Sequence, residues 1–124
     1  MTALTRRRTA AAMAALTGLI HLILVPEYLE EKTYIGLLFL GAAVVCGAVA
    51  ATLWRRDEPL AWGVGALTCA GMFVGFVLSR TVGLPGFHEA EWELSGVITL
   101  VADAAFIGLA ATGLRGSLPA AAAS

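Results

Sequence analysis

The sequence predicts an all-α membrane protein in which four transmembrane helices form an up-down-up-down bundle, and three observations lead to this fold class. The 124 residues are 59% hydrophobic and the mean hydropathy is +0.84, more apolar surface than a soluble domain of this size can bury. The apolar residues form four separate runs, each near the ~20 residues that a helix needs to cross a bilayer. The formal net charge is only −1, which indicates no nucleic-acid partner and leaves the lipid bilayer as the expected one.

The first apolar run covers residues 9–25 and directly follows three arginines, Arg6, Arg7 and Arg8. Such a start is also typical of an export signal, but no small-residue cleavage site closes this run. The run therefore predicts an uncleaved first span, which is the shortest of the four and for that reason little tilted in the membrane.

The other three runs cover residues 34–54, 60–79 and 94–114. Backbone groups in lipid must be paired within the segment, and these runs are too long and too regular in hydropathy for barrel strands, so helices are expected. The connection 55–59 is a tight turn in which Pro59 suits the start of a helix, and such short connections make neighbouring helices antiparallel. The predicted parts are a cytoplasmic N-terminus (1–8), a four-helix transmembrane domain (9–114) and a flexible cytoplasmic C-terminal tail (115–124).

The charges are unevenly distributed about the four spans. One side carries the arginines Arg6, Arg7, Arg8, Arg55, Arg56 and Arg115. The other side carries Lys32 and Arg80 among the acids Glu27, Glu30, Glu31, Glu89, Glu91 and Glu93. The positive-inside rule predicts a multi-pass protein of the bacterial cytoplasmic (inner) membrane, with both termini in the cytoplasm and two acidic loops forming a small cap outside. Aromatic belts are expected at Trp54 and Trp62 on the inner side and at Tyr28, Tyr34 and Trp92 on the outer side.

Small residues recur at four-residue spacing in the later spans: Ala43, Gly47 and Ala51 in the second, Gly71 and Gly75 in the third, and Ala104 and Gly108 in the fourth. Small residues on one helix face let two backbones approach closely inside a membrane. Two interpretations stay open: the glycines pack the chain against itself, or they join it to another subunit, which would make it a homo-oligomer or part of a larger membrane complex.

Three polar residues lie within or at the end of the spans and form a candidate polar pocket, namely His21, Asp103 and Arg80. Asp103 lies roughly 13 Å below the outer end of its span, where an ionised carboxylate is costly unless it is paired, hydrated or protonated. It suits a proton, ion or metal site, or a hydrogen bond to a neighbouring helix. His21 suits a metal ligand or a group that titrates near neutral pH, or a hydrogen-bond donor to a backbone carbonyl or to Asp103. Arg80 suits a salt bridge with Glu89 or Glu93, or a clamp for an anionic headgroup.

A divalent metal is the cofactor that the residue types favour. The candidate ligands are His21, Glu27, Glu30, His88 and Glu89. Imidazole and carboxylate suit zinc or manganese, but the spacing matches no established metal motif. Acids in the first turn of a helix are also favoured by the helix dipole alone.

Two further features concern local structure. Cys46 and Cys69 lie at similar depth in neighbouring spans, so they could be adjacent, although each also reads as a small apolar residue. The segment from Gly83 to Gly86, with Pro85 between them, predicts a sharp reversal of the chain before the fourth span.

Three short motifs carry a resemblance: His21-Leu22 with Pro26-Glu27, Gly36-Leu37-Leu38-Phe39, and Ser79-Arg80-Thr81-Val82-Gly83-Leu84-Pro85-Gly86. In these residues the chain resembles small four-span integral membrane proteins of high-GC bacteria. The resemblance implies a four-helix membrane fold and a shared group of residues on the outer face. It implies no activity, so no functional residue is carried over from it.

The function that the sequence favours is a non-enzymatic accessory or interaction subunit of a membrane complex, because a chain of 124 residues leaves little room for a gated pathway. The alternative is metal or ion binding or transport through an outward-opening polar pocket. A weaker alternative is a membrane-embedded enzyme acting on a lipid or quinone, with Arg80 or His88 at the interface. The sequence contains no phosphate loop or nucleophile elbow, and no catalytic residue is predicted.

Overall fold

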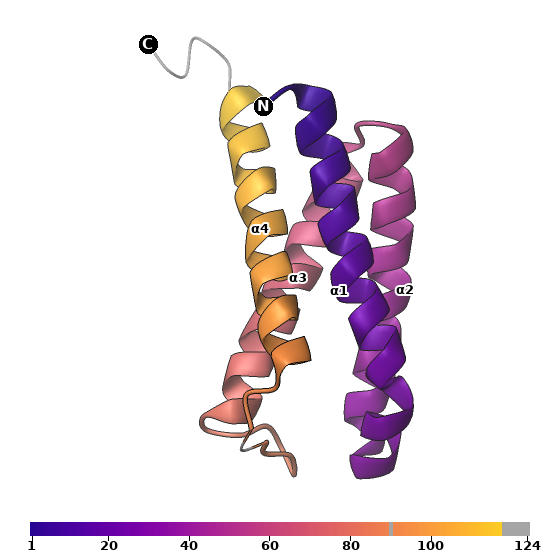
Figure 1. Ribbon diagram of the computed structural model, residues 1–124, viewed down its shortest axis with the longest axis vertical. Coiled ribbons are helices and arrows are strands. Elements are labelled where there is room, and N and C mark those ends of the chain that lie inside the picture. Colours follow the sequence, from indigo (N-terminus) through magenta and orange to yellow (C-terminus); the bar gives the residue numbers. More distant parts are fainter. Residues whose placement is uncertain (90, 118–124) are drawn as a thin grey trace.

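The computed structural model describes residues 1–89 and 91–117, which fold into four helices. These are α1 (Ala3–Glu31), α2 (Thr33–Arg55), α3 (Pro59–Arg80) and α4 (Leu94–Ser117), arranged side by side as a bundle (Figure 1). Each helix is long and apolar enough to cross a membrane. The predicted fold class, an all-α four-helix bundle, is confirmed, and four such helices fit a multi-pass membrane protein.

The connections at both ends of α2 are short, so neighbouring helices run in opposite directions. Lys32 alone separates α1 from α2 and adopts an extended backbone with φ −157°. Before α3, the Glu58 side chain accepts a hydrogen bond from the Leu60 N–H at 3.4 Å, and Pro59 follows as the first helical residue. In Figure 1 the start of α1 and the end of α4 lie together at the top, whereas the α1–α2 and α3–α4 connections lie at the bottom.

The two ends of the bundle differ in charge and are named here for it. The arginine end carries Arg6, Arg7, Arg8, Arg55 and Arg56. The glutamate end carries Glu27, Glu30, Glu31, Glu89, Glu91 and Glu93. At the arginine end, Arg7 donates to the Leu53 carbonyl at 2.8 Å and Arg6 donates to the Leu109 carbonyl at 3.3 Å. The Leu53 carbonyl lies in the last turn of α2, where a positive charge is also favoured by the helix dipole, and the Arg6 bond joins the start of α1 to α4.

Helix α1 is the longest of the four, not the shortest as the sequence predicted. It has 29 residues, begins after Thr2, whose hydroxyl accepts from the Thr5 N–H at 3.1 Å, and continues through Pro26 to Glu31. Hydropathy marks only the apolar middle of this helix, while its charged first and last turns are helical as well. Helix α4 runs three residues past the predicted boundary, to Ser117, and the rest of the predicted tail, 118–124, lies outside the described residues.

The connection between α3 and α4 makes the sharp reversal that the sequence predicted. Gly83, at φ +89°, ends α3 by donating its N–H to the Leu78 carbonyl at 2.7 Å. Leu84 and Phe87 then exchange two backbone hydrogen bonds of 2.7 and 2.9 Å around Gly86, which has φ +66°. Both glycines adopt the left-handed conformation that other residues rarely take.

The buried core lies toward the arginine end, and we call this region the packed half. Its buried members are Ala10, Ala11, Ala14, Val49, Leu53, Ala61, Cys69 and Phe106. The close helix approaches occur at glycines that the sequence analysis did not single out. A Cβ on Gly18 would lie 2.9 Å from the Cys46 Cβ, and one on Gly65 would overlap the Phe106 ring.

The four glycines predicted for helix packing lie elsewhere. At Gly47, Gly71, Gly75 and Gly108 an added Cβ would meet no described atom within 4 Å outside its own helix. These glycines therefore do not close the chain's own helices together. Packing within the chain is not observed at these glycines, which the spacing could not predict, because the lipid-facing and inward-facing sides of a membrane helix are both apolar and a small residue does not reveal its side. The other interpretation, contact with another subunit, stays a prediction.

Candidate functional site

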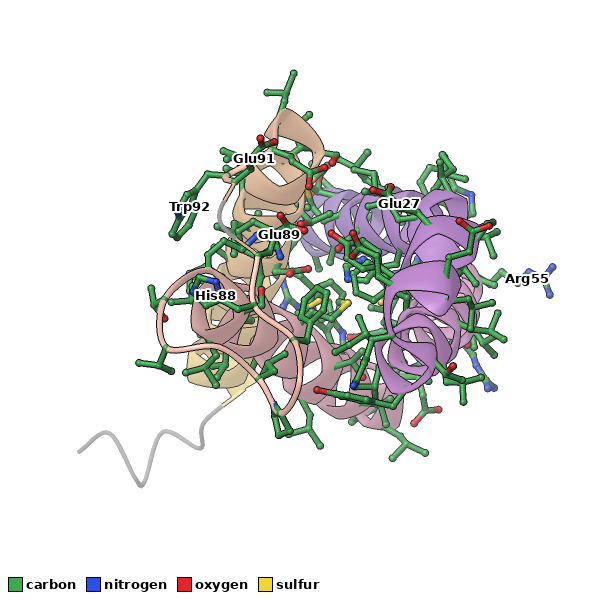
Figure 2. All side chains as sticks on the ribbon, turned by 90° about the horizontal axis from the view of Figure 1, so that it is seen from below. Glu27, Arg55, His88, Glu89, Glu91 and Trp92 are labelled. Carbon is green, nitrogen blue, oxygen red and sulfur yellow. The ribbon has the colours of Figure 1, made fainter. Side chains whose placement is uncertain are left out.

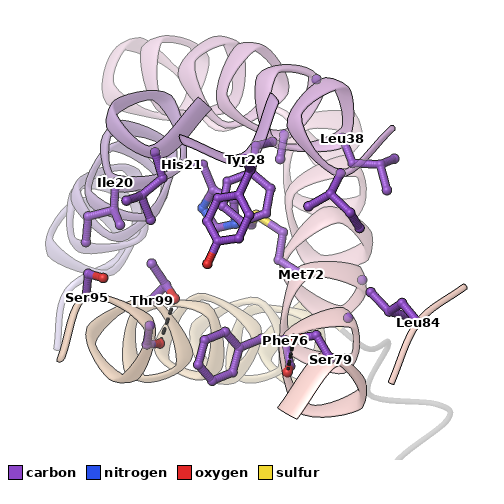
Figure 3. A pocket seen from close by; sticks show the side chains of 18 of the residues that line it. Ile20, His21, Tyr28, Leu38, Met72, Phe76, Ser79, Leu84, Ser95 and Thr99 are labelled. Carbon is purple, nitrogen blue, oxygen red and sulfur yellow. Dashed lines mark hydrogen bonds between the residues drawn. The ribbon is translucent and has the colours of Figure 1, made fainter. Parts of the chain in front are cut away.

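A cavity of about 460 Å³ lies between the four helices on the side of the glutamate end, and we call this region the hollow half. Its lining is mostly apolar, with a few polar side chains from three of the helices. Figure 3 shows His21 and Tyr28 reaching from α1 into this space, with Thr99, Phe76 and Met72 around it. Cavities of roughly 300–1,000 Å³ with few, well-placed polar groups are typical of small-molecule sites.

The cavity exists because small residues face it. Gly41 and Ala42 on α2 and Gly71 and Gly75 on α3 belong to its lining. Gly75 is partly buried, yet a Cβ there would find open space. The large side chains of the hollow half lie around the cavity, as Phe76 does against Gly96, whereas Phe106 fills the centre of the packed half.

The cavity opens sideways between α2 and α3. Leu37 and Leu38 belong to its lining, yet 56% and 62% of their surfaces are exposed, so they lie at its rim. The glutamate end of the cavity is covered instead by Leu84 and Phe87 of the α3–α4 connection. The cavity thus opens toward the apolar surface of the bundle and is covered toward the charged glutamate end.

Arg80 joins three segments at the covered end of the cavity. Its guanidinium donates to the Glu91 carbonyl at 3.1 Å, the Ser79 hydroxyl at 2.8 Å and the Tyr28 hydroxyl at 3.4 Å. It also lies 3.7 Å from the Glu93 carboxylate, and the Arg80 side chain is only 4% exposed. The predicted salt bridge with Glu93 is confirmed. We call these five residues the Arg80 cluster, and their contacts make a tie between helices the best description of this arginine.

His21 lies deeper in the same cavity. Its Nδ1 is 2.8 Å from the Thr17 carbonyl oxygen, one turn earlier on α1. Its ring packs against Phe39 of α2 with 4.7 Å between ring centroids, and Phe39 packs in turn against Tyr28 at 4.4 Å. Of the two roles predicted for His21, the hydrogen bond to a backbone carbonyl is the one observed. We call His21, Phe39 and Tyr28 the aromatic wall of the cavity.

Asp103 lies in the centre of the bundle and is 1% exposed. Its Oδ1 accepts a hydrogen bond from the Thr17 hydroxyl at 2.9 Å, which joins α4 to α1. The Cys69 thiol lies beside this carboxyl group and beside Cys46, and both cysteines are free and buried. The two cysteines are therefore adjacent, a point that the sequence left open. Asp103 serves as the interhelical hydrogen-bond partner that was one of its two predicted roles.

The three residues of the predicted polar pocket thus lie at three different depths along the bundle. Arg80 and His21 line one cavity, Arg80 at its covered end and His21 toward its floor. Asp103 lies below, connected to His21 through Thr17, which bonds to both residues. The sequence predicted one pocket for these three residues but could not predict their order along the bundle.

The residues proposed as metal ligands are not brought together. Within residues 1–89 and 91–117, no group of three or more His, Cys, Asp or Glu side chains could hold a metal ion. Glu27 and Glu30 are exposed on α1, while His88 lies on the α3–α4 connection and donates from Nε2 to the Thr81 carbonyl at 3.0 Å. The end-on view in Figure 2 shows Glu27 and His88 on different sides of the glutamate end. The geometry lends no support to a metal centre.

Sequence reasoning missed or misplaced four residues of this region. Thr17 and Thr99 were not considered, and Phe39 appeared only within a motif. Tyr28 was predicted in the outer aromatic belt, but its side chain is 2% exposed and points into the bundle (Figure 3), a role that was not considered. A usable signal existed for the threonines: Thr17 precedes His21 by four residues and Thr99 precedes Asp103 by four, a spacing that puts each pair on one helix face.

The chain was compared with known protein families, with curated proteins and with solved structures, and nothing in these comparisons matches it.

Proposed function

We propose that this chain is a membrane-embedded binding protein that holds a small lipid-soluble molecule in the cavity between its four helices. The observation that carries this proposal is the cavity itself, about 460 Å³ and mostly apolar. A molecule dissolved in the hydrocarbon region would enter between α2 and α3, past Leu37 and Leu38, without crossing water. The Arg80 cluster separates the cavity from the charged end of the bundle.

The proposal retains one ligand class from the sequence analysis, a lipid or quinone, without assigning chemistry to it. Binding suits the site because the groups around the cavity are few and mutually hydrogen-bonded, which fits positioning a ligand. An anionic ligand is less well supported, because the Arg80 guanidinium already donates to three oxygens and lies beside Glu93.

Binding can be tested with para-decylanisole, a neutral aryl ether with an alkyl tail, and protein in lipid nanodiscs. We expect protein-dependent binding above empty nanodiscs for the wild type. Gly75→Leu should weaken it by about tenfold or more, because the new side chain occupies the cavity. Gly47→Leu is the matched control, since both glycines have open space at Cβ but only Gly75 lines the cavity. Absent binding to the wild type, or equal binding to both variants, would overturn the proposal.

The orientation that goes with this function has the arginine end in the cytoplasm. The positive-inside rule supports it, because five arginines cluster at that end and acids predominate at the other. The test is thiol labelling of intact cells with Glu30→Cys, and with Asp57→Cys at the arginine end as the control. Cys46 and Cys69 are 1% and 0% exposed and should stay unlabelled. Labelling of Asp57→Cys alone would reverse the orientation.

A second candidate function, an accessory subunit, is favoured by one observation. Gly47 and Gly108 are exposed and have open space beside them, as a helix of another subunit would require. In this case the native protein, extracted in mild detergent, should have the mass of a complex. The double variant Gly47→Leu with Gly108→Leu should instead have the mass of a single chain. A wild type that is extracted as a single chain would end this candidate.

A further inference from the structure

The His21 ring has one nitrogen that is already used and one that is available to a ligand. Nδ1 lies 2.8 Å from the Thr17 carbonyl oxygen. A carbonyl oxygen can only accept, so Nδ1 must carry the hydrogen and donate it. In a neutral imidazole the other nitrogen, Nε2, then has no hydrogen and is a hydrogen-bond acceptor.

That acceptor is accessible from the cavity. In the part of the chain that the structure describes, every fully enclosed side-chain nitrogen or oxygen has a hydrogen-bond partner. The Nε2 atom of His21 has no partner there, so it is not fully enclosed, and the residue retains 8% exposure where it lines the cavity. A ligand group could therefore reach Nε2 without displacing any protein group.

The nearby hydroxyl groups are acceptors as well. Thr99 donates its only hydroxyl proton to the Gly96 carbonyl at 2.7 Å, and Ser79 donates its own to the Phe76 carbonyl at 2.7 Å (Figure 3). Their oxygens keep lone pairs but have no hydrogen left to offer. At Nε2 of His21 the cavity therefore presents an acceptor, and a ligand group that meets this nitrogen must donate.

The shape of the site narrows the ligand further. The aromatic wall has ring centroids 4.7 Å apart between His21 and Phe39 and 4.4 Å apart between Phe39 and Tyr28. Such a wall favours a flat ring that can pack against it in an offset or tilted arrangement. The rim at Leu37 and Leu38 leaves room for an apolar tail to extend toward the lipid.

Together these features point to one ligand class, and this inference rests on the proposed function. We infer that the cavity binds a phenol-type ring, either a phenol or a hydroquinone, with an apolar tail. The ring hydroxyl donates its hydrogen bond to Nε2 of His21. The ring packs on the aromatic wall, and the tail leaves between α2 and α3.

A matched pair of probes tests this inference, para-decylphenol and its methyl ether para-decylanisole. Both have the same ring and tail, but only the phenol can donate a hydrogen bond. In nanodiscs we expect the wild type to bind the phenol about three- to tenfold more tightly than the ether, beyond the ratio seen in empty nanodiscs. In His21→Phe, which keeps a ring at the wall but removes the acceptor, the two probes should bind equally. Phe39→Leu is the control and should weaken both probes by the same factor.

Each outcome separates the inference from the function on which it rests. Equal binding of both probes to the wild type would overturn the phenol assignment while the binding function stands. A phenol preference that persists in His21→Phe would show that His21 is not the acceptor. Failure of the wild type to bind either probe would overturn the binding function itself. Retained binding of the ether by His21→Phe reports that this variant is folded.

Discussion

The packed half and the hollow half of the bundle contain the same kinds of residue, yet only one is filled. In the packed half, Phe106 is 0% exposed and occupies the space between α3 and the other helices, against Gly65 and Val49. In the hollow half, Gly71 and Gly75 face open space and a cavity of about 460 Å³ remains. A buried ring thus fills the centre of the bundle at the arginine end, whereas the centre of the other half stays open although Phe76 packs closely on Gly96 there.

This difference has a physical basis in the membrane. In water, exposed apolar surface drives helices together, so an apolar gap tends to collapse. In lipid that drive is absent, and helices associate through close packing and interhelical hydrogen bonds. A bundle can therefore be held together by Phe106 and the Thr17–Asp103 bond on one side of the cavity and by the Arg80 cluster on the other, while the cavity between them stays open.

The largest expected effect is the loss of the side chain that fills the packed half. Phe106→Ala should lower the free energy of unfolding by about 3 kcal/mol, because a cavity replaces a fully buried ring. Phe39→Ala is the comparison in the hollow half, and it should cost distinctly less, since Phe39 already borders empty space. Unfolding in detergent micelles would measure both. Equal losses would mean that the two halves contribute alike to stability.

A methyl group added at a glycine should have opposite effects in the two halves. Gly65→Ala should lower the free energy of unfolding by about 1–3 kcal/mol, because its Cβ overlaps the Phe106 ring. Gly75→Ala should be neutral or should stabilise by up to about 1 kcal/mol, because alanine favours a helix and meets open space. Thermal unfolding of the two purified variants gives the sign of each change. A loss at Gly75 as large as that at Gly65 would contradict the open cavity.

The sequence predicted the framework of this molecule well. Run length and hydropathy are enough to identify four membrane-spanning helices, because lipid requires each span to satisfy its own backbone. The turn at Gly83 and Gly86 and the Arg80–Glu93 pair were also predictable, since both follow from local chemistry. The length of α1 was underestimated, because hydropathy does not register a helical turn made of arginines or glutamates.

The candidate site was only half predictable. His21, Asp103 and Arg80 could be proposed as candidates because placing polar side chains of these types in lipid costs free energy. Thr17 and Thr99 were not predicted because a threonine hydroxyl can donate to a backbone carbonyl of its own helix. Burying a threonine in a span therefore costs little free energy. The cavity itself was not predictable, because nothing in the sequence separates Gly75, which faces space, from Gly65, which faces Phe106.

A smaller effect is expected at the hydrogen bond that joins α1 to α4. Asp103→Ala should lower the free energy of unfolding by about 1–2 kcal/mol, because it leaves the buried Thr17 hydroxyl without its acceptor. Asp103→Asn keeps an acceptor oxygen and should lose less. The double variant Thr17→Val with Asp103→Ala should lose less than the sum of the single changes. Additive losses in this double-mutant cycle would show that the bond does not couple the two helices.

The smallest expected effect lies at the arginine end, where Arg8 packs over the Trp54 ring at 4.7 Å. Trp54 is 49% exposed, so this cation–π contact is largely solvated, and Arg8→Gln should lower the free energy of unfolding by about 0.5 kcal/mol. The loss should be small because Arg8 contributes to the charge difference between the two ends, whereas the buried residues of the packed half provide the stability. Unfolding measured at low and high salt would test this, with Lys32→Gln as a matched loss of one charge at the other end. If Arg8→Gln proved as damaging as Phe106→Ala, the stability of the packed half would have to be assigned to its surface charges and not to its core.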